Sequence, residues 1–259
     1  MRPKLLLLVG GGLAMWRLKR YYADATADDL WWMLAPTASL AGAATRTVFV
    51  RAAGEGYLSH DRLFLIEKSC AGINFMIAAL GMLMFVSFHR AATWRSAGRV
   101  LTVSVLASYA AAIVVNATRI SIAMWMAAHP IAPTVLTAEA AHRIEGITVY
   151  FCGLVLLYGL ARRLDGADSG DRFWWAAAPL AAYYVVTLGI PMANGHGGSN
   201  AFAAHAAVVL VLPLVLIAVI ALGGACARRR ARESQASGAP ARARRWAWHV
   251  RAGGQKLTV

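Results

Sequence analysis

Three side chains of this sequence combine reactive chemistry with positions inside or beside apolar segments. Cys70 directly precedes an apolar run, where a helix N-terminus and nearby cations would stabilise a thiolate. Arg119 lies within a later apolar run and never loses its charge, so it must face protein or water. His142 opens the run after that and could assist proton transfer. Together a cysteine, a histidine and a cation within mutual reach would form a cysteine-nucleophile site.

Each of the three also has a simpler interpretation. Cys70 could be a solitary buried thiol, and His142 a structural hydrogen-bond donor. Arg119 could be a structural charge that is paired with an acid or with carbonyl groups. These alternatives remain open at the level of residue type alone.

Four further polar residues stand close to these candidates in the sequence: Glu67, Asn74, Asn116 and Glu145. Asn74, Asn116 and Glu145 are each three or four residues from one candidate, a spacing that puts two side chains on one helix face. Glu145 could thereby orient His142, and Glu67 precedes the cysteine. Polar packing within a helical bundle is the alternative for all four.

The composition indicates that membrane helices carry these residues. Hydrophobic residues make up 59% and charged residues 15% of the 259 positions, against about 45–50% and 25% in soluble domains. A bilayer span needs about 20 apolar residues. Five segments qualify: 71–88, 100–128, 144–160, 173–190 and 201–227. With the weaker runs 5–16 and 30–50, the sequence predicts an all-α bundle of about seven, at least six and at most eight, transmembrane helices.

The net charge of +14 is concentrated in the last segment of the chain. Residues 228–259 hold nine Lys or Arg against one acid, and therefore carry +8 of that charge. We predict an integral-membrane domain over 1–227, followed by a basic, disordered cytoplasmic tail over 228–259. The tail could touch membrane lipids, and its charge is no indication of specific nucleic-acid binding.

Basic residues in short loops mark the cytoplasmic side of a membrane. Loops 89–99 and 161–172 are basic, whereas loops 129–141 and 191–200 have no Lys or Arg. This alternation puts Cys70, Arg119 and His142 together on the outer side. If 30–50 spans, there are seven helices and Arg17–Arg20 falls inside; if it lies flat, there are six and Arg17–Arg20 falls outside. We expect seven, and a retained rather than cleaved first helix.

Around the three candidates, the sequence resembles the exosortase/archaeosortase family of membrane-embedded cysteine transpeptidases, and most closely the exosortase K subgroup. The family shows a Cys-x-Gly segment at a helix start, an Asn-x-x-Arg within a later span, and a His-x-x-x-Gly at the start of the next. The matching stretches are Glu67–Phe75, Asn116–Ile120 and His142–Gly146, in the same order, and the resemblance covers roughly residues 60–160.

The resemblance implies a function and a location. Such enzymes are proposed to cleave exported proteins that end in a short motif, a hydrophobic span and a basic segment. Cys70 would be the nucleophile that forms a thioester, His142 the acid and base, and Arg119 the holder of the oxyanion. The protein would lie in a bacterial inner membrane with its site facing the periplasm, and it would need no cofactor or metal.

Other classes of function fit the sequence less well. A membrane thiol oxidoreductase needs a close cysteine pair, and none exists among the three cysteines. A serine protease would depend on the weak segment Gly197-Gly198-Ser199. A metal site could be drawn only from His129, His142, His196 and His205, whose spacing matches no common ligand pattern. The main rival is a small transporter or non-catalytic membrane protein that uses Arg119 as an anion-binding or structural charge.

Overall fold

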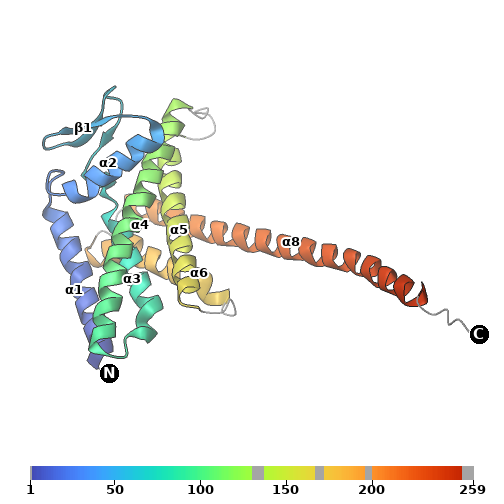
Figure 1. Ribbon diagram of the computed structural model, residues 1–259. Helices are drawn as coiled ribbons and strands as arrows, with labels where there is room; N and C mark the ends of the chain where they lie inside the picture. The colour runs from blue at the N-terminus through green and yellow to red at the C-terminus, as the bar shows by residue number, and fades with distance from the viewer. Residues whose placement is uncertain (1, 130–136, 167–171, 196–199, 253–259) are drawn as a thin grey trace, which may run out of the picture. The chain divides into compact units, whose positions relative to one another are not determined.

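The computed structural model describes residues 2–129, 137–166, 172–195 and 200–252, and it is mostly helical (Figure 1). Its α-helices are α1 (Arg2–Asp24), α2 (Trp31–Thr45), α3 (Ile73–Val86), α4 (Trp94–Ala128), α5 (Ala138–Leu164), α6 (Arg172–Tyr184), α7 (Ile190–Ala193) and α8 (Asn200–Ala252). Two 3-10 turns, η1 (Lys68–Ala71) and η2 (Ser87–Arg90), flank α3, and a π-helix, η3 (Val185–Gly189), separates α6 from α7. The predicted predominance of helix is confirmed.

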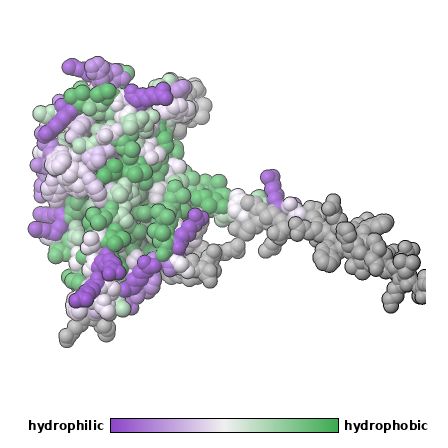
Figure 2. All heavy atoms as spheres, viewed as in Figure 1, coloured by the Kyte–Doolittle hydropathy of each residue, from purple (hydrophilic) through white to green (hydrophobic). Residues whose placement is uncertain are grey.

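Five helical stretches in the described residues are long and apolar enough to cross a membrane. They are Lys68–Arg90, Trp94–Ala128, Glu139–Leu164, Trp175–Ala193 and Phe202–Cys226. These coincide with the five clear spans predicted from the sequence. On the face drawn in Figure 2, hydrophobic residues gather across the middle of unit Met1–Pro213, while hydrophilic residues lie at its edges. The protein is therefore a helical membrane bundle.

Helix α3 lies at the centre of this bundle and contacts α1, α4, α5 and α6. Ten of its 14 residues are buried, because a helix that is apolar all round can be enclosed on every side. Helix α4 begins at Trp94 because Thr93 and Ser96 form a reciprocal capping box. Helix α5 begins after Thr137, whose hydroxyl accepts from the Ala140 backbone N–H at 3.2 Å.

The segment between α2 and η1 forms a small antiparallel sheet of three strands. Its strands are β1 (Phe49–Ala52), β2 (Gly56–Ser59) and β3 (Leu65–Ile66), in that order. The Asp28 carboxylate accepts from Arg51 and from the Gly54 backbone N–H, each at 2.8 Å. These hydrogen bonds favour the ionised form and lower the pKa of Asp28 below its usual range.

Helix α2 is too short to be the additional span that the seven-helix prediction requires. Its 15 residues extend about 22 Å at 1.5 Å per residue, against a hydrocarbon thickness of about 30 Å. Helix α2 instead packs against α4, where the Tyr109 hydroxyl donates to the Trp32 carbonyl at 2.8 Å.

The predicted placement of Arg17–Arg20 on the face opposite Cys70 is wrong. Lys19 Nζ donates to Asn74 Oδ1 at 2.8 Å, and Lys68 Nζ donates to the Ala23 carbonyl at 3.0 Å. The end of α1 therefore lies at the same end of the bundle as Cys70, as the six-helix alternative requires. The number of spans beyond the five stated above stays a prediction.

Helix α8 continues through residues 228–252, the segment for which the sequence predicts a disordered tail. Alanine and arginine are strong helix formers, so the composition that suggested a flexible tail also supports a continuous helix. The chain divides into two compact units, Met1–Pro213 and Leu214–Val259, and the membrane domain over 1–227 with its tail over 228–259 stays a prediction. All candidate site residues belong to the first unit.

Candidate active site

Cys70 lies in the 3-10 turn η1 directly before α3, and it is half-buried. Its backbone N–H donates to the Glu67 carbonyl at 2.9 Å, which closes the turn. Gly72 then takes a left-handed conformation with φ of 69°, a region that glycine enters without steric cost. The glycine separates the turn from α3, so Cys70 and Asn74 do not share a helix as the spacing predicted.

Helix α4 holds this turn in place through Asn116. The Asn116 amide Nδ2 donates to the Cys70 carbonyl oxygen, and Asn116 is fully buried. A Cβ atom added to Gly72 would lie 3.3 Å from Asn116 Cβ, so the glycine also permits the close approach of α4. The Cys-x-Gly and Asn-x-x-Arg segments are therefore in direct contact.

We expect Gly72→Ala to destabilise the protein, because alanine pays about 1–2 kcal/mol in the left-handed region and also crowds Asn116. The melting temperature should fall by roughly 2–8 °C in a detergent-solubilised thermal unfolding experiment. Gly98→Ala is the matched control, since a Cβ atom at Gly98 in α4 meets nothing within 4 Å. Equal melting temperatures for the two variants would contradict the strained-turn interpretation.

Arg119 extends from α4 to α5 and is largely buried, with 16% of its side chain exposed. Its Nη2 lies 3.0 Å from His142 Nε2, and its Nη1 donates to the Tyr150 hydroxyl at 3.4 Å. The guanidinium carbon also stands 5.3 Å from the centre of the Tyr150 ring. A Cβ at Gly146 would lie 3.1 Å from Arg119 Nε, so this glycine makes room for the guanidinium.

The contact between Arg119 and His142 fixes the hydrogen-bonding role of the imidazole. A guanidinium can only donate, so Nε2 of His142 must accept and carry no proton. The ring proton of the neutral imidazole then sits on Nδ1, which faces Glu145 Oε2 at 3.7 Å. His142 is thus arranged as a neutral group with its basic nitrogen towards the cation.

Glu145 is the buried counter-charge of this cluster, with 4% of its side chain exposed. Its Oε2 lies 3.7 Å from both Arg119 Nε and His142 Nδ1, which is ion-pair rather than hydrogen-bond distance. Neither carboxylate oxygen has a hydrogen-bond partner among the described residues. Charge compensation by Arg119 is therefore the main interaction that offsets the burial of this carboxylate.

Tyr150 joins the two halves of the site, and the sequence analysis missed it. Its hydroxyl accepts from Arg119 and donates to Asn116 Oδ1 at 2.9 Å. A continuous series of hydrogen bonds thus runs from Arg119 through Tyr150 and Asn116 to the Cys70 carbonyl. Tyr150 follows His142 by eight residues, two i+4 steps along one helix face, and this spacing could have identified it.

A cavity of about 510 Å³ adjoins these groups. Arg119, His142 and Tyr150 line it together with Ser69 and Gly72 from either end of the Cys70 turn, while Cys70 itself is not among its described lining residues. Further lining residues include Lys19, Tyr22, Asn74, Arg143, Thr187 and His205. The cavity is rich in cationic groups, so it suits a ligand that presents carbonyl or anionic oxygens.

The predicted residues differ in how closely the structure associates them. Arg119, His142 and Glu145 form one cluster, while Asn116 connects that cluster to the main chain of Cys70. The Cys70 Sγ itself lies 3.8 Å from Ser69 Oγ. The other two supporting residues contact groups outside the cluster: Glu67 is exposed and accepts from Ser69 Oγ, and Asn74 lines the cavity and accepts from Lys19.

The described part of the chain gives little support to the alternative metal site and the alternative serine-protease site. His196 and Ser199 lie outside the described residues. His129 makes a contact within its own helix, 3.0 Å from the Trp125 carbonyl, and within the described ranges no three His, Cys, Asp or Glu side chains gather as metal ligands would.

Comparison of the chain with protein-family models, with curated proteins and with solved structures finds no match in any of the three.

Proposed function

We propose that this protein is an exosortase-type cysteine peptidase or transpeptidase of the membrane. The observation that carries the proposal is the contact of Arg119 with His142 beside a cavity that reaches the Cys70 turn. These three residues come from different elements and lie at one end of the bundle. The proposed location is a bacterial inner membrane, with this end facing the periplasm and α8 ending in the cytoplasm.

The first half of the proposed reaction forms a thioester. His142 Nε2 accepts the Cys70 thiol proton, and Sγ attacks the carbonyl carbon of the scissile peptide bond. The carbonyl oxygen becomes negative and takes over the Arg119 Nη2–H that contacts His142 in this structure. The carbon–nitrogen bond then breaks, and His142 returns its proton to the leaving amine.

The second half releases the product. An amine acceptor or water attacks the thioester carbonyl carbon, its proton passes to His142, and Sγ leaves as the thiolate. The charge of Glu145, 3.7 Å from His142 Nδ1, favours the imidazolium that forms during the reaction and compensates the charge of Arg119. The same residues thus serve both hydrolysis and transfer.

Processing of a target protein tests the proposal directly. The target carries an epitope tag and ends in a short motif, a hydrophobic span and a basic segment, and its cleavage is followed by mass shift after co-expression. We expect cleavage with the wild-type chain and a strong reduction with Cys70→Ala, Arg119→Ala and His142→Ala. Undiminished cleavage by all three variants would remove the proposal, whereas a transporter would tolerate Cys70→Ala and still depend on Arg119.

We expect Tyr150→Phe to slow processing by about tenfold, because it disconnects Arg119 from Asn116 while keeping the aromatic ring. Tyr184→Phe is the matched control, since that hydroxyl donates to the Leu210 carbonyl at 2.6 Å and does not line the cavity. Tyr184→Phe loses one phenolic hydrogen bond, whereas Tyr150→Phe loses two. A positioning role for Tyr150 predicts slower processing at unchanged substrate affinity only in the first variant, and equal rates would contradict it.

A further inference from the structure

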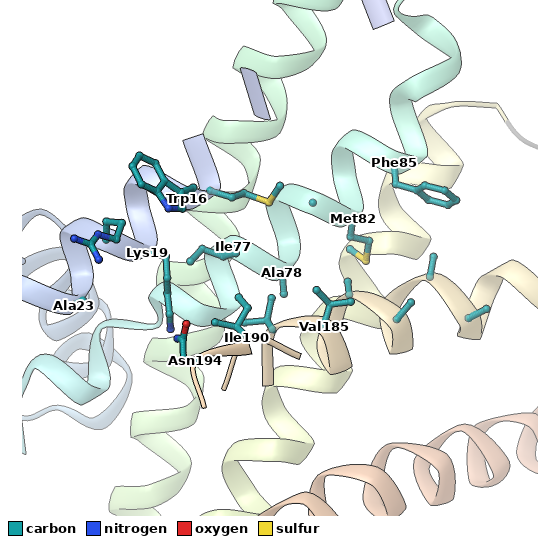
Figure 3. Close-up of a pocket in the computed structure, with 18 residues that line it drawn as sticks. Trp16, Lys19, Ala23, Ile77, Ala78, Met82, Phe85, Val185, Ile190 and Asn194 are labelled. Carbon is teal, nitrogen blue, oxygen red and sulfur yellow. The ribbon is translucent and has the colours of Figure 1, made fainter. Parts of the chain in front are cut away.

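A second, larger cavity lies against the same bundle, between α1, α3 and the α6–η3–α7 segment (Figure 3). Its volume is about 960 Å³. Small side chains form much of its wall, including Ala78 and Gly81 of α3 and a row of alanines on α6, Ala177, Ala178, Ala181 and Ala182. The π-helix η3 contributes Val185 and Val186, and Val186 also lines the candidate active-site cavity.

The polarity of this second cavity, called the groove below, changes along its length. Lys19, Ala23 and Asn194 lie together at one end in Figure 3, while Met82 and Phe85 lie at the other. Arg20 also lines the groove, and no Asp or Glu is among its described lining residues. Neither Lys19 nor Arg20 forms an ion pair with a carboxylate in the described part of the chain. The groove therefore has a cationic end and an apolar remainder.

The size of the groove separates two kinds of occupant. The part of α3 that lines it, Ile77 to Phe85, extends about 12 Å. A transmembrane helix crosses about 30 Å with a diameter of about 10 Å, and so has a volume of about 2,400 Å³. The groove holds less than half of that volume, but it falls within the range of about 300–1,000 Å³ that is usual for small-molecule sites.

We propose that this groove binds one phospholipid with an anionic headgroup. The headgroup phosphate lies against Lys19 and Arg20, and the acyl chains fill the apolar remainder towards Phe85. Charge complementarity at the rim and the absence of acidic lining residues from the described chain favour an anionic over a zwitterionic lipid. The site is independent of the proposed peptidase chemistry, since lipid binding requires neither Cys70 nor His142.

Native mass spectrometry of the delipidated full-length protein tests this site by titration with phosphatidylglycerol and with phosphatidylcholine. We expect phosphatidylglycerol to bind more tightly, and Arg20→Gln to weaken it by about fivefold. Ala181→Phe, which fills the groove from an exposed position, should abolish the specific binding. Arg17→Gln and Leu160→Phe are the matched controls, because both side chains are exposed and neither lines the groove.

Three results would overturn the lipid site. Equal affinity for the two lipids would remove its anionic character, and full binding by Ala181→Phe would place the lipid elsewhere. If, in addition, Ala181→Phe no longer bound a synthetic transmembrane peptide that the wild type binds, the groove would be a binding site for a polypeptide. Thermal unfolding of each variant separates these results from loss of fold.

Discussion

Replacing Cys70 with alanine is expected to reduce target processing by roughly 10⁴-fold, because the proposed reaction has no other nucleophile. Loss of the thiol leaves Arg119 and His142 in contact, so the fold and the cavity should persist. The measurement is the rate at which the tagged target shortens in membranes that contain equal amounts of wild-type or variant protein. A thioester intermediate adds a second signature. Hydroxylamine should cleave the thioester and release the target from the wild-type protein, whereas the variant should form no covalent adduct with the target.

The chain supplies its own controls for this experiment. Cys152 is half-buried within α5 and Cys226 is exposed on α8, and neither belongs to the turn that Asn116 joins to the Arg119–His142 cluster. Cys152→Ala and Cys226→Ala should therefore process the target at the wild-type rate. If Cys70→Ala also did so, the thiol of Cys70 would be no more than a packing group, and the cysteine-peptidase proposal would fail.

The transmembrane elements follow from the sequence because the bilayer imposes a simple requirement. An uninterrupted apolar run of sufficient length has few folded alternatives to a helix, and all five clear runs become helical stretches. The short segments were less predictable. The three-stranded sheet makes tertiary contacts such as Asp28 with Arg51, which local patterns do not encode.

The topology error arose from a rule about loop charge. The positive-inside rule assigned Arg17–Arg20 to the cytoplasm, whereas Lys19 contacts Asn74 at the end of the bundle that holds Cys70. The position of Lys19 is set by its hydrogen bond to Asn74, and therefore need not follow the loop-charge statistics. This exception is consistent with the anionic ligand proposed for Lys19 and Arg20.

Within the site, contacts between neighbouring spans were predictable and those through a turn were not. Arg119 and His142 stand at matching depths on successive helices, so their contact follows from topology. The predicted sharing of a helix face by Cys70 and Asn74 failed because the left-handed Gly72 interrupts the helix between them. Tyr150 was not among the predicted site residues, because a tyrosine within an apolar run is more commonly a packing residue.

Replacing Arg119 with alanine is expected to have two separable effects, one on stability and one on chemistry. The substitution leaves the buried Glu145 carboxylate without its compensating cation, which should destabilise the fold by up to about 3 kcal/mol. It also removes the N–H groups proposed to hold the oxyanion, which should slow processing by about 10²–10³-fold. Thermal unfolding and the processing rate measure the two effects independently.

A double variant decides whether Arg119 is catalytic or only structural. Arg119→Met with Glu145→Gln removes both charges while keeping similar volumes, so stability should return close to that of the wild type. A purely structural arginine would then allow processing to recover as well, and that recovery would contradict the proposed oxyanion role. If processing stays about 10²–10³-fold low while the melting temperature is restored, and Glu145→Gln alone processes the target much faster than the double variant, the lost function belongs to the guanidinium itself. Arg99→Gln, which removes an exposed charge near the opposite end of α4, should change neither quantity.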